Sequence, residues 1–101
     1  MINIKINKQA DALVVALEGD LNNVASMQAE KSLAPVFECT DSDVVIDCTA
    51  LNYISSSGLR LMLNIYKHTR SCGHKSIMRG LTDEVKEVFQ LSGFLQLFEV
   101  K

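Results

Sequence analysis

The chain of 101 residues has neither a cluster of basic side chains nor a long apolar run. Its 10 lysines and arginines are interspersed with 12 acidic residues, which gives a formal net charge of −2. Because nucleic-acid binding needs several basic side chains that neutralise phosphates together, we expect no nucleic-acid partner. No segment approaches the roughly 18 uninterrupted apolar residues of a membrane-spanning helix, so the sequence predicts no membrane association.

Signals for export are also missing. Residues 1–15 alternate apolar with polar side chains and lack the apolar core of a signal peptide. The cysteines number only three, Cys39, Cys48 and Cys72, and they are far apart in the chain. An odd number at such spacing fits reduced thiols better than a disulfide framework, so we expect a cytoplasmic protein.

Motifs of catalysis and cofactor binding are absent. The sequence contains no Gly-rich phosphate loop and no Gly-x-Ser-x-Gly elbow. The only histidines, His68 and His74, are expected on the surface, and His68 lies about three helical turns from the nearest serines. Cys72 lies close to His74, but Cys39 and Cys48 match no zinc spacing. We therefore predict a protein that is not an enzyme and holds no cofactor and no metal.

What the chain does have is the composition of one ordinary globular domain, spanning residues 1–101. Hydrophobic residues make up 48 % and charged residues 22 %, enough for a core that needs no disulfides. We expect a monomer or a weak dimer.

Two strands are predicted at the start of the chain. Ile2, Ile4 and Ile6 alternate with polar residues, which is typical of a strand with one buried face. Residues 12–17 form a continuous apolar run that ends before Gly19. The gap between the two runs is short enough for a hairpin, which indicates antiparallel pairing.

The remaining elements alternate between helix and strand. A helix is expected over residues 24–33, with an imperfect stripe of Val24, Met27, Lys31 and Leu33, and Pro35 ends or kinks it. The later elements are a strand at 44–47, a helix from 59 to about 71, a strand at 75–79, a helix over 85–91 capped by Thr82, and an edge strand at 97–100. The order β-β-α-β-α-β-α-β predicts an α/β fold with a mixed, mostly parallel sheet of about five strands.

A run of serines joins the central strand to its helix. Ser55, Ser56, Ser57 and Gly58 suit a turn and a helix N-cap, and Leu59, Met62, Leu63 and Tyr66 follow at the spacing of one helix face. The serines are therefore expected beside the unpaired N–H groups of a helix N-terminus, where a phosphate is favoured. The alternative is that all three serines simply cap the helix.

Residues 44–63 resemble the central motif of STAS domains, the class of the bacterial anti-sigma factor antagonists. The family pattern is an apolar strand, then Asp-Ser-Ser-Gly-Leu, then a helix; residues 56–59 match its last four positions, and Ser55 occupies the acidic one. In the family the serine after the acidic position is phosphorylated by a partner kinase, so the resemblance carries that role to Ser56. Gly19, Gly73 and residues 91–94 also fall where the family has equivalent features.

Two positions depart from the family pattern. Ser55 replaces the usual Asp, and Asn22 replaces an acidic residue that many members carry after the second strand. Asp20 is near in sequence and is the candidate to substitute for them.

The predicted partner surface combines the loop at residues 20–23 with the solvent side of the helix after the serines, which Arg60 and Asn64 mark. Its residues are Asp20, Asn22, Asn23, Ser55, Ser57, Gly58, Arg60 and Asn64. Leu61 and Ile65 widen the apolar stripe of that helix; they either face a partner or, as we favour, pack against the sheet.

By this resemblance the unphosphorylated protein binds an anti-sigma factor with serine kinase activity, frees the sigma factor and so regulates transcription indirectly. Phosphate on Ser56 would switch it off by partner switching, and a phosphatase would restore it. The alternative from another class is a STAS scaffold or small-ligand-sensing subunit of a signalling complex that is never phosphorylated.

Overall fold

The computed structural model describes residues 2–101 as a five-stranded mixed sheet with helices, the α/β fold that the sequence predicts. The strands are β1 (Ile2–Lys8), β2 (Ala12–Leu21), β3 (Asp43–Ile54), β4 (Ser76–Arg79) and β5 (Glu99–Val100). The helices are α1 (Asn23–Ser32), α2 (Ala34–Glu38), α3 (Ser56–Ser71), α4 (Asp83–Leu91) and the short 3₁₀ helix η1 (Phe94–Gln96).

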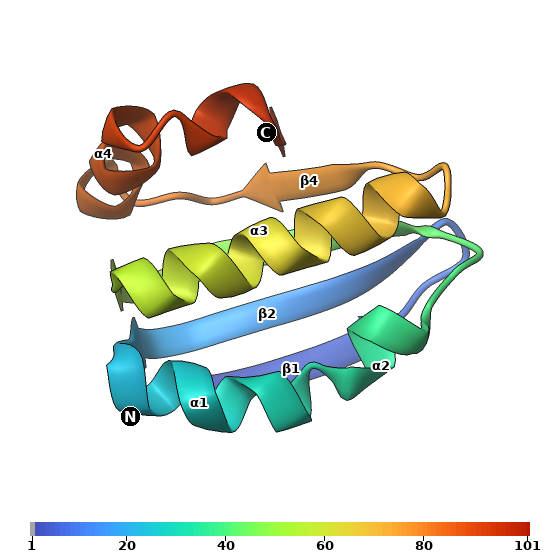
Figure 1. Ribbon diagram of the computed structural model, residues 1–101, viewed down its shortest axis with the longest axis horizontal. Helices are drawn as coiled ribbons and strands as arrows, with labels where there is room; N and C mark the ends of the chain where they lie inside the picture. Colours follow the sequence, from blue (N-terminus) through green and yellow to red (C-terminus); the bar gives the residue numbers. More distant parts are fainter. Residues whose placement is uncertain (1) are drawn as a thin grey trace.

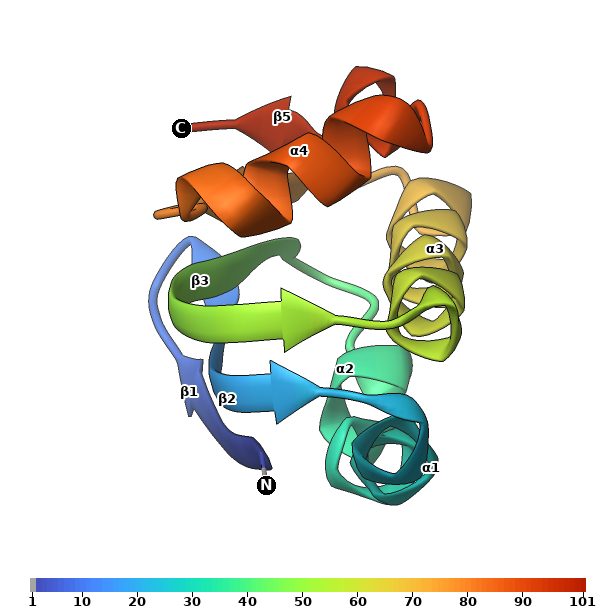
Figure 2. The same ribbon diagram turned by 90° about the vertical axis from the view of Figure 1, so that its left-hand side faces the viewer.

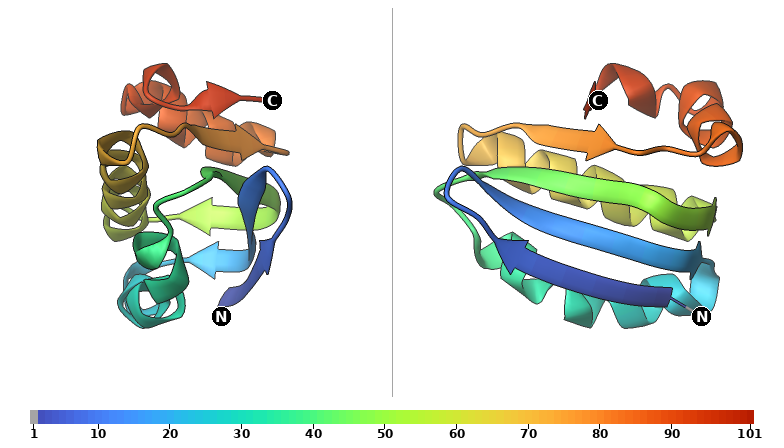
Figure 3. Two further views of the ribbon diagram at one scale, coloured as in Figure 1. Left: turned by 90° about the vertical axis from the view of Figure 1, so that its right-hand side faces the viewer. Right: turned by 180° about the vertical axis from the view of Figure 1, so that it is seen from behind.

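The strands lie in the order β1-β2-β3-β4-β5, so each pairs with its neighbour in sequence. β1 and β2 form the predicted antiparallel hairpin, and the other pairs are parallel. Helices α1, α2 and α3 stack along one face of the sheet (Figure 2). α4 lies beyond the C-terminal end of β4 (Figure 1), and it contacts β3. Seen from behind, β1 forms one open edge of the sheet (Figure 3).

The central strand is much longer than predicted. β3 continues past residue 47 to Ile54 because Cys48, Leu51 and Ile54 keep supplying buried side chains. Its pairing with β2 shifts register twice, between Ala16 and Glu18 and between Gly19 and Asp20, which lets the strand bend and still present these residues to the core. The last strand is shorter than predicted, because residues 94–96 form a 3₁₀ helix and leave only residues 99 and 100 paired with β4.

The first helix lies where the sequence predicts it but buries other residues. Val24 and Met27 of the predicted apolar stripe are 66 % and 73 % exposed, whereas Leu33 of that stripe is buried together with Ala25 and Ala29. Small alanines allow α1 to lie close to its neighbours, and their spacing of four residues continues to Leu33. Pro35 begins a second helix, since its missing N–H costs nothing in a first turn.

Helix α3 also uses a wider apolar arc than its predicted stripe. Leu61, Met62 and Ile65 are almost fully buried, whereas Leu59, Leu63 and Tyr66 of that stripe are only half-buried. The packing interpretation of Leu61 and Ile65 is therefore confirmed. Within residues 2–101, no helix has the length and apolar character that crossing a bilayer requires.

Candidate phosphorylation and partner-binding site

Two helix N-termini lie next to each other where the C-terminal ends of β2 and β3 form one edge of the sheet. β2 and β3 are parallel neighbours that end together, with Leu21 opposite Ile54, and α1 and α3 begin directly after them. The backbone N–H of Ser55 donates to the carbonyl of Leu21 at 2.9 Å, which holds the two chain segments in register. In Figure 2 both strands run into their helices on the same side of the molecule.

The three serines differ in burial and in role. Ser55 is the N-cap of α3: it is 8 % exposed, and its hydroxyl accepts a hydrogen bond from the N–H of Gly58 at 3.1 Å. Ser56 is the first residue of the helix and is exposed, and Ser57 is half-buried. Since Ser55 alone makes the side-chain cap, the hydroxyl of Ser56 is available at the surface.

Gly58 sets how closely α3 approaches the strands. A methyl group in its place would lie 2.8 Å from Cγ1 of Ile54 and 3.0 Å from the side chain of Leu21. Gly58 and Ser55, which the sequence predicted as partner contacts, are both buried. They therefore help to set the position of α3 and do not present side chains to a partner. The other predicted residues of the helix, Arg60 and Asn64, are exposed.

The predicted contact residues at the end of β2 and just after it do not all face the helix starts. Asn22 is the exposed N-cap of α1, and its side-chain oxygen accepts from the N–H of Ala25 at 2.8 Å; Asn23 is also exposed. Leu21 faces the helices and is fully buried, so the preceding strand residue, Asp20, points to the opposite face of the sheet. Asp20 therefore does not replace the missing carboxylates beside Ser56.

The electrostatic setting favours an anion. α1 and α3 have neutral caps, Asn22 and Ser55, and neither helix has an acidic residue in its first turn. The positive ends of two helix dipoles thus meet at this edge with no carboxylate in those turns to compensate them.

The sequence interpretation missed an apolar contribution from α1. A hollow of about 160 Å³ runs between α1 and α3 and is lined by Met27, Ser57, Arg60 and Asn64, among others. Met27 and the neighbouring Val24 are largely exposed apolar side chains. The signal that could have revealed them is the series Ala25, Ala29 and Leu33, which places Val24 and Met27 off the buried face.

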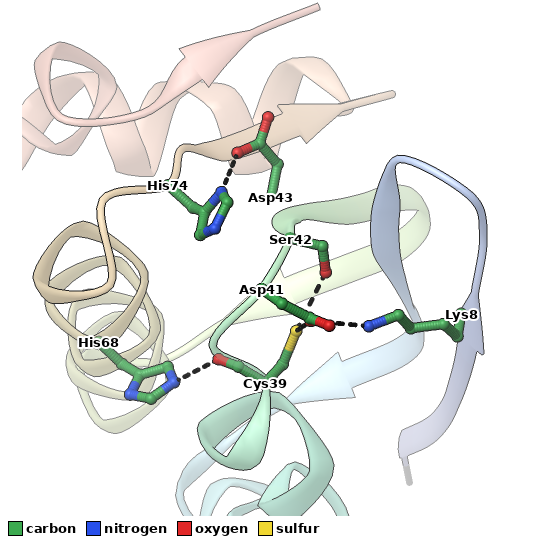
Figure 4. Close-up of polar contacts among 7 residues, drawn as sticks. All are labelled: Lys8, Cys39, Asp41, Ser42, Asp43, His68 and His74. Atoms are coloured by element: carbon green, nitrogen blue, oxygen red, sulfur yellow. Dashed lines mark hydrogen bonds and ion pairs between the residues drawn. The ribbon is translucent and has the colours of Figure 1, made fainter.

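The histidines lie far from the serines, around the other end of α3, where both are half-buried and so remain partly exposed at the surface. Figure 4 shows His68 directed at the carbonyl of Cys39, with Nε2 at 2.8 Å, and His74 directed at Asp43, with Nδ1 at 3.2 Å. The pKa of Asp43 is lowered because its carboxylate accepts from the backbone N–H of Lys75 and then from His74. These contacts join loops to the sheet and do not reach Ser56.

The thiols are free in this structure. Burial raises the pKa of Cys48 to about 12, so this thiol stays protonated inside the sheet. Among residues 2–101, no group of three or more His, Cys, Asp or Glu side chains could hold a metal ion.

Comparison with known proteins agrees with this fold. The family model described as "STAS domain" matches residues 3–101, and the chain therefore belongs to the STAS domain family. BtrV of Bordetella bronchiseptica, named as a candidate anti-sigma factor antagonist, is 34 % identical over 99 residues, covering 98 % of this chain and 85 % of that protein.

A further relative is more distant. The anti-sigma-B factor antagonist of Listeria monocytogenes is 24 % identical over 102 residues, covering 99 % of this chain and 89 % of its own length. The Bacillus protein SpoIIAA is similar in fold. Its unphosphorylated form, an anti-sigma factor antagonist, superposes with a TM-score of 0.74 at 17 % identity, covering 98 % of this chain and 87 % of that one. Its phosphorylated form has a TM-score of 0.74 at 18 % identity, with coverages of 98 % and 91 %.

Proposed function

We propose that this protein is an anti-sigma factor antagonist of the cytoplasm. In its unphosphorylated form it binds an anti-sigma factor that has serine kinase activity, and phosphorylation of Ser56 releases that partner. The observation that carries the proposal is the exposed hydroxyl of Ser56 at the first position of α3, on a chain whose relatives are named as antagonists of anti-sigma factors.

The partner surface extends over both helix starts. Arg60 and Asn64 contribute polar contacts from α3, and Asn22 and Asn23 contribute them from the start of α1. Met27 adds an apolar side chain beside the hollow between the helices. Large exposed apolar side chains framed by polar ones are common in protein interfaces, which makes Met27 the expected anchor.

Phosphate at Ser56 acts on binding and leaves the fold intact. The group adds a charge of roughly −1.5 to −2, which the N–H groups of a helix N-terminus tolerate. The neutral caps Ser55 and Asn22 do not repel it. A partner pressed over Ser56 and Met27 would have to desolvate that charge, so the complex dissociates while the domain stays folded.

The first experiment maps the modified residue. The protein is incubated with its cognate anti-sigma kinase and ATP, and the phosphopeptides are sequenced by mass spectrometry. We expect phosphate on Ser56 in the wild type and in Ser57→Ala, and no phosphate in Ser56→Ala. Phosphate on another residue while Ser56 stays unmodified would contradict the assignment.

The second experiment measures binding of the same kinase by calorimetry. Ser56→Ala should bind like the wild type, and Ser56→Asp should bind at least about tenfold more weakly, which corresponds to roughly 1.4 kcal/mol. Met27→Ser should weaken binding without changing the melting temperature, because the side chain is exposed in the free protein. Equal affinities of Ser56→Ala and Ser56→Asp would refute the switch.

A second candidate is a STAS scaffold or small-ligand-sensing subunit that is never phosphorylated. The replacement of two usually acidic positions by Ser55 and Asn22 favours it. Mass spectrometry of protein purified from its own host, with and without phosphatase treatment, separates the two candidates, since only the antagonist carries a phosphate that the enzyme removes.

A further inference from the structure

A hollow of about 290 Å³ opens at the end of α3 opposite Ser56. It is lined by Tyr66 and Arg70 of α3, Ser76 at the start of β4, and Leu97 and Glu99 near the C-terminus. Its volume is close to the lower end of the range of small-molecule sites. Neither the predicted phosphorylation site nor the predicted partner surface includes any of these residues.

Positive charge gathers on this hollow. Arg70 and Lys75 both line it and are exposed, and neither forms an ion pair in the part of the chain that the structure describes. The guanidinium of Arg70 is held in place, since it donates to the hydroxyl of Tyr66 at 2.8 Å. Glu99 in the lining and Asp43, whose carboxylate lies beside Lys75 and pairs with His74, offset part of this positive charge.

The carbonyls at the C-terminal end of α3 do not depend on Arg70 or Lys75 as hydrogen-bond donors. The carbonyls of its last turn accept from the backbone N–H groups of Cys72, Gly73 and His74, and Gly73 adopts the left-handed conformation that such an ending requires. His74, which also lines the hollow, is paired with Asp43. Arg70 and Lys75 therefore remain available to a ligand.

Ser76, one of the residues that line the hollow, has a buried hydroxyl without a partner among the residues that the structure describes. Ser76 is 5 % exposed, and its Oγ forms no hydrogen bond with any residue that the structure describes. Ser76 shares a face of β4 with the fully buried Met78, at a position where an apolar residue would serve packing equally well. Because buried polar groups in native proteins are nearly always hydrogen-bonded, this hydroxyl indicates an acceptor that the isolated chain does not supply.

We propose that this hollow binds a small organic anion, a carboxylate or phosphate attached to an apolar or aromatic group. Arg70 and Lys75 hold the charged group, and the Ser76 hydroxyl donates to it after rotation about its Cα–Cβ bond. The apolar part of the ligand lies along Tyr66 and Leu97. The site is independent of phosphorylation at Ser56.

The test titrates the whole chain, labelled with ¹⁵N, with phenyl phosphate, benzoate and inorganic phosphate, and follows backbone amide shifts. We expect saturable shifts confined to residues 66–77 and 97–99 with at least one of the aromatic anions. Comparison of phenyl phosphate with benzoate identifies the preferred charged group. Inorganic phosphate should bind more weakly than phenyl phosphate, since it lacks the apolar part.

Variants connect the shifts to the residues. Arg70→Gln and Lys75→Gln should each lower the affinity for the preferred anion about tenfold, the effect of losing one charge-assisted hydrogen bond. Arg60→Gln, which removes a cation near the other end of the same helix, should leave it unchanged. Ser76→Ala should lower the affinity and, without ligand, raise the melting temperature, because it removes an unsatisfied buried hydroxyl.

Shifts that do not saturate, or that persist unchanged in Arg70→Gln and Lys75→Gln, would overturn the proposal. So would saturable shifts centred on Ser56, since the anion would then prefer the N-terminus of α3. Arg60→Gln distinguishes this outcome, because the substitution would weaken only anion binding at the N-terminus of α3.

Discussion

Replacing Gly58 by alanine tests the close contact on which the position of Ser56 depends. The new methyl group would lie 2.8 Å from Cγ1 of Ile54 and 3.0 Å from two carbons of Leu21, and both neighbours are buried. Overpacking of this kind costs about 1 to 3 kcal/mol, and the better helix propensity of alanine returns up to roughly 1 kcal/mol. We expect a net loss of about 1 to 2 kcal/mol.

The loss is measurable by thermal unfolding. For a domain of this size, 1 kcal/mol shifts the melting temperature by about 4 to 8 °C, so Gly58→Ala should melt roughly 5 to 15 °C below the wild type. Ser57→Ala, one residue earlier and half-buried, is the matched control and should change it by much less. An unchanged or raised melting temperature in Gly58→Ala would show that α3 does not press on Leu21 and Ile54.

Further predictions concern capping, pH and thiol reactivity. Ser55→Ala removes the side-chain cap of α3 and should destabilise the protein by about 1 kcal/mol in urea unfolding, whereas Ser55→Asp should not. The pKa of Asp47 is lowered below its ordinary 3.8, chiefly by the hydroxyl of Thr49 at 2.6 Å. The stabilisation by this carboxylate is therefore present at neutral pH and lost as pH falls through its folded pKa, so the difference in free energy of unfolding between wild type and Asp47→Asn should shrink in acid. Cys48, with its pKa raised to about 12, should react with a thiol reagent at pH 8 only after denaturation, and modification of the native protein there would contradict its burial.

Much of the fold was predictable because local patterns and tertiary packing agree. The alternation of Ile2, Ile4 and Ile6 and the short gap after them predicted the hairpin, and Gly73 and Thr82 marked true helix boundaries. The predictions failed where packing from several sides decides burial. Val24 and Met27 are larger and more apolar than Ala25 and Ala29, yet the alanines face the core because α1 lies close to its neighbours.

The candidate site follows the same division. The sequence alone determined that serines stand at a helix start, because small polar residues before an apolar helical pattern favour an N-cap. Only the tertiary structure decided which serine caps and which stays exposed, since the hydrogen bond of Ser55 to Gly58 depends on how α3 leaves β3. It also decided that Asp20 lies on the face of β2 opposite the buried Leu21 and that α1 brings Met27 to the same edge. These facts depend on the register in which β2 pairs with β3, a contact between segments some 30 residues apart in the chain, and no local pattern encodes that register.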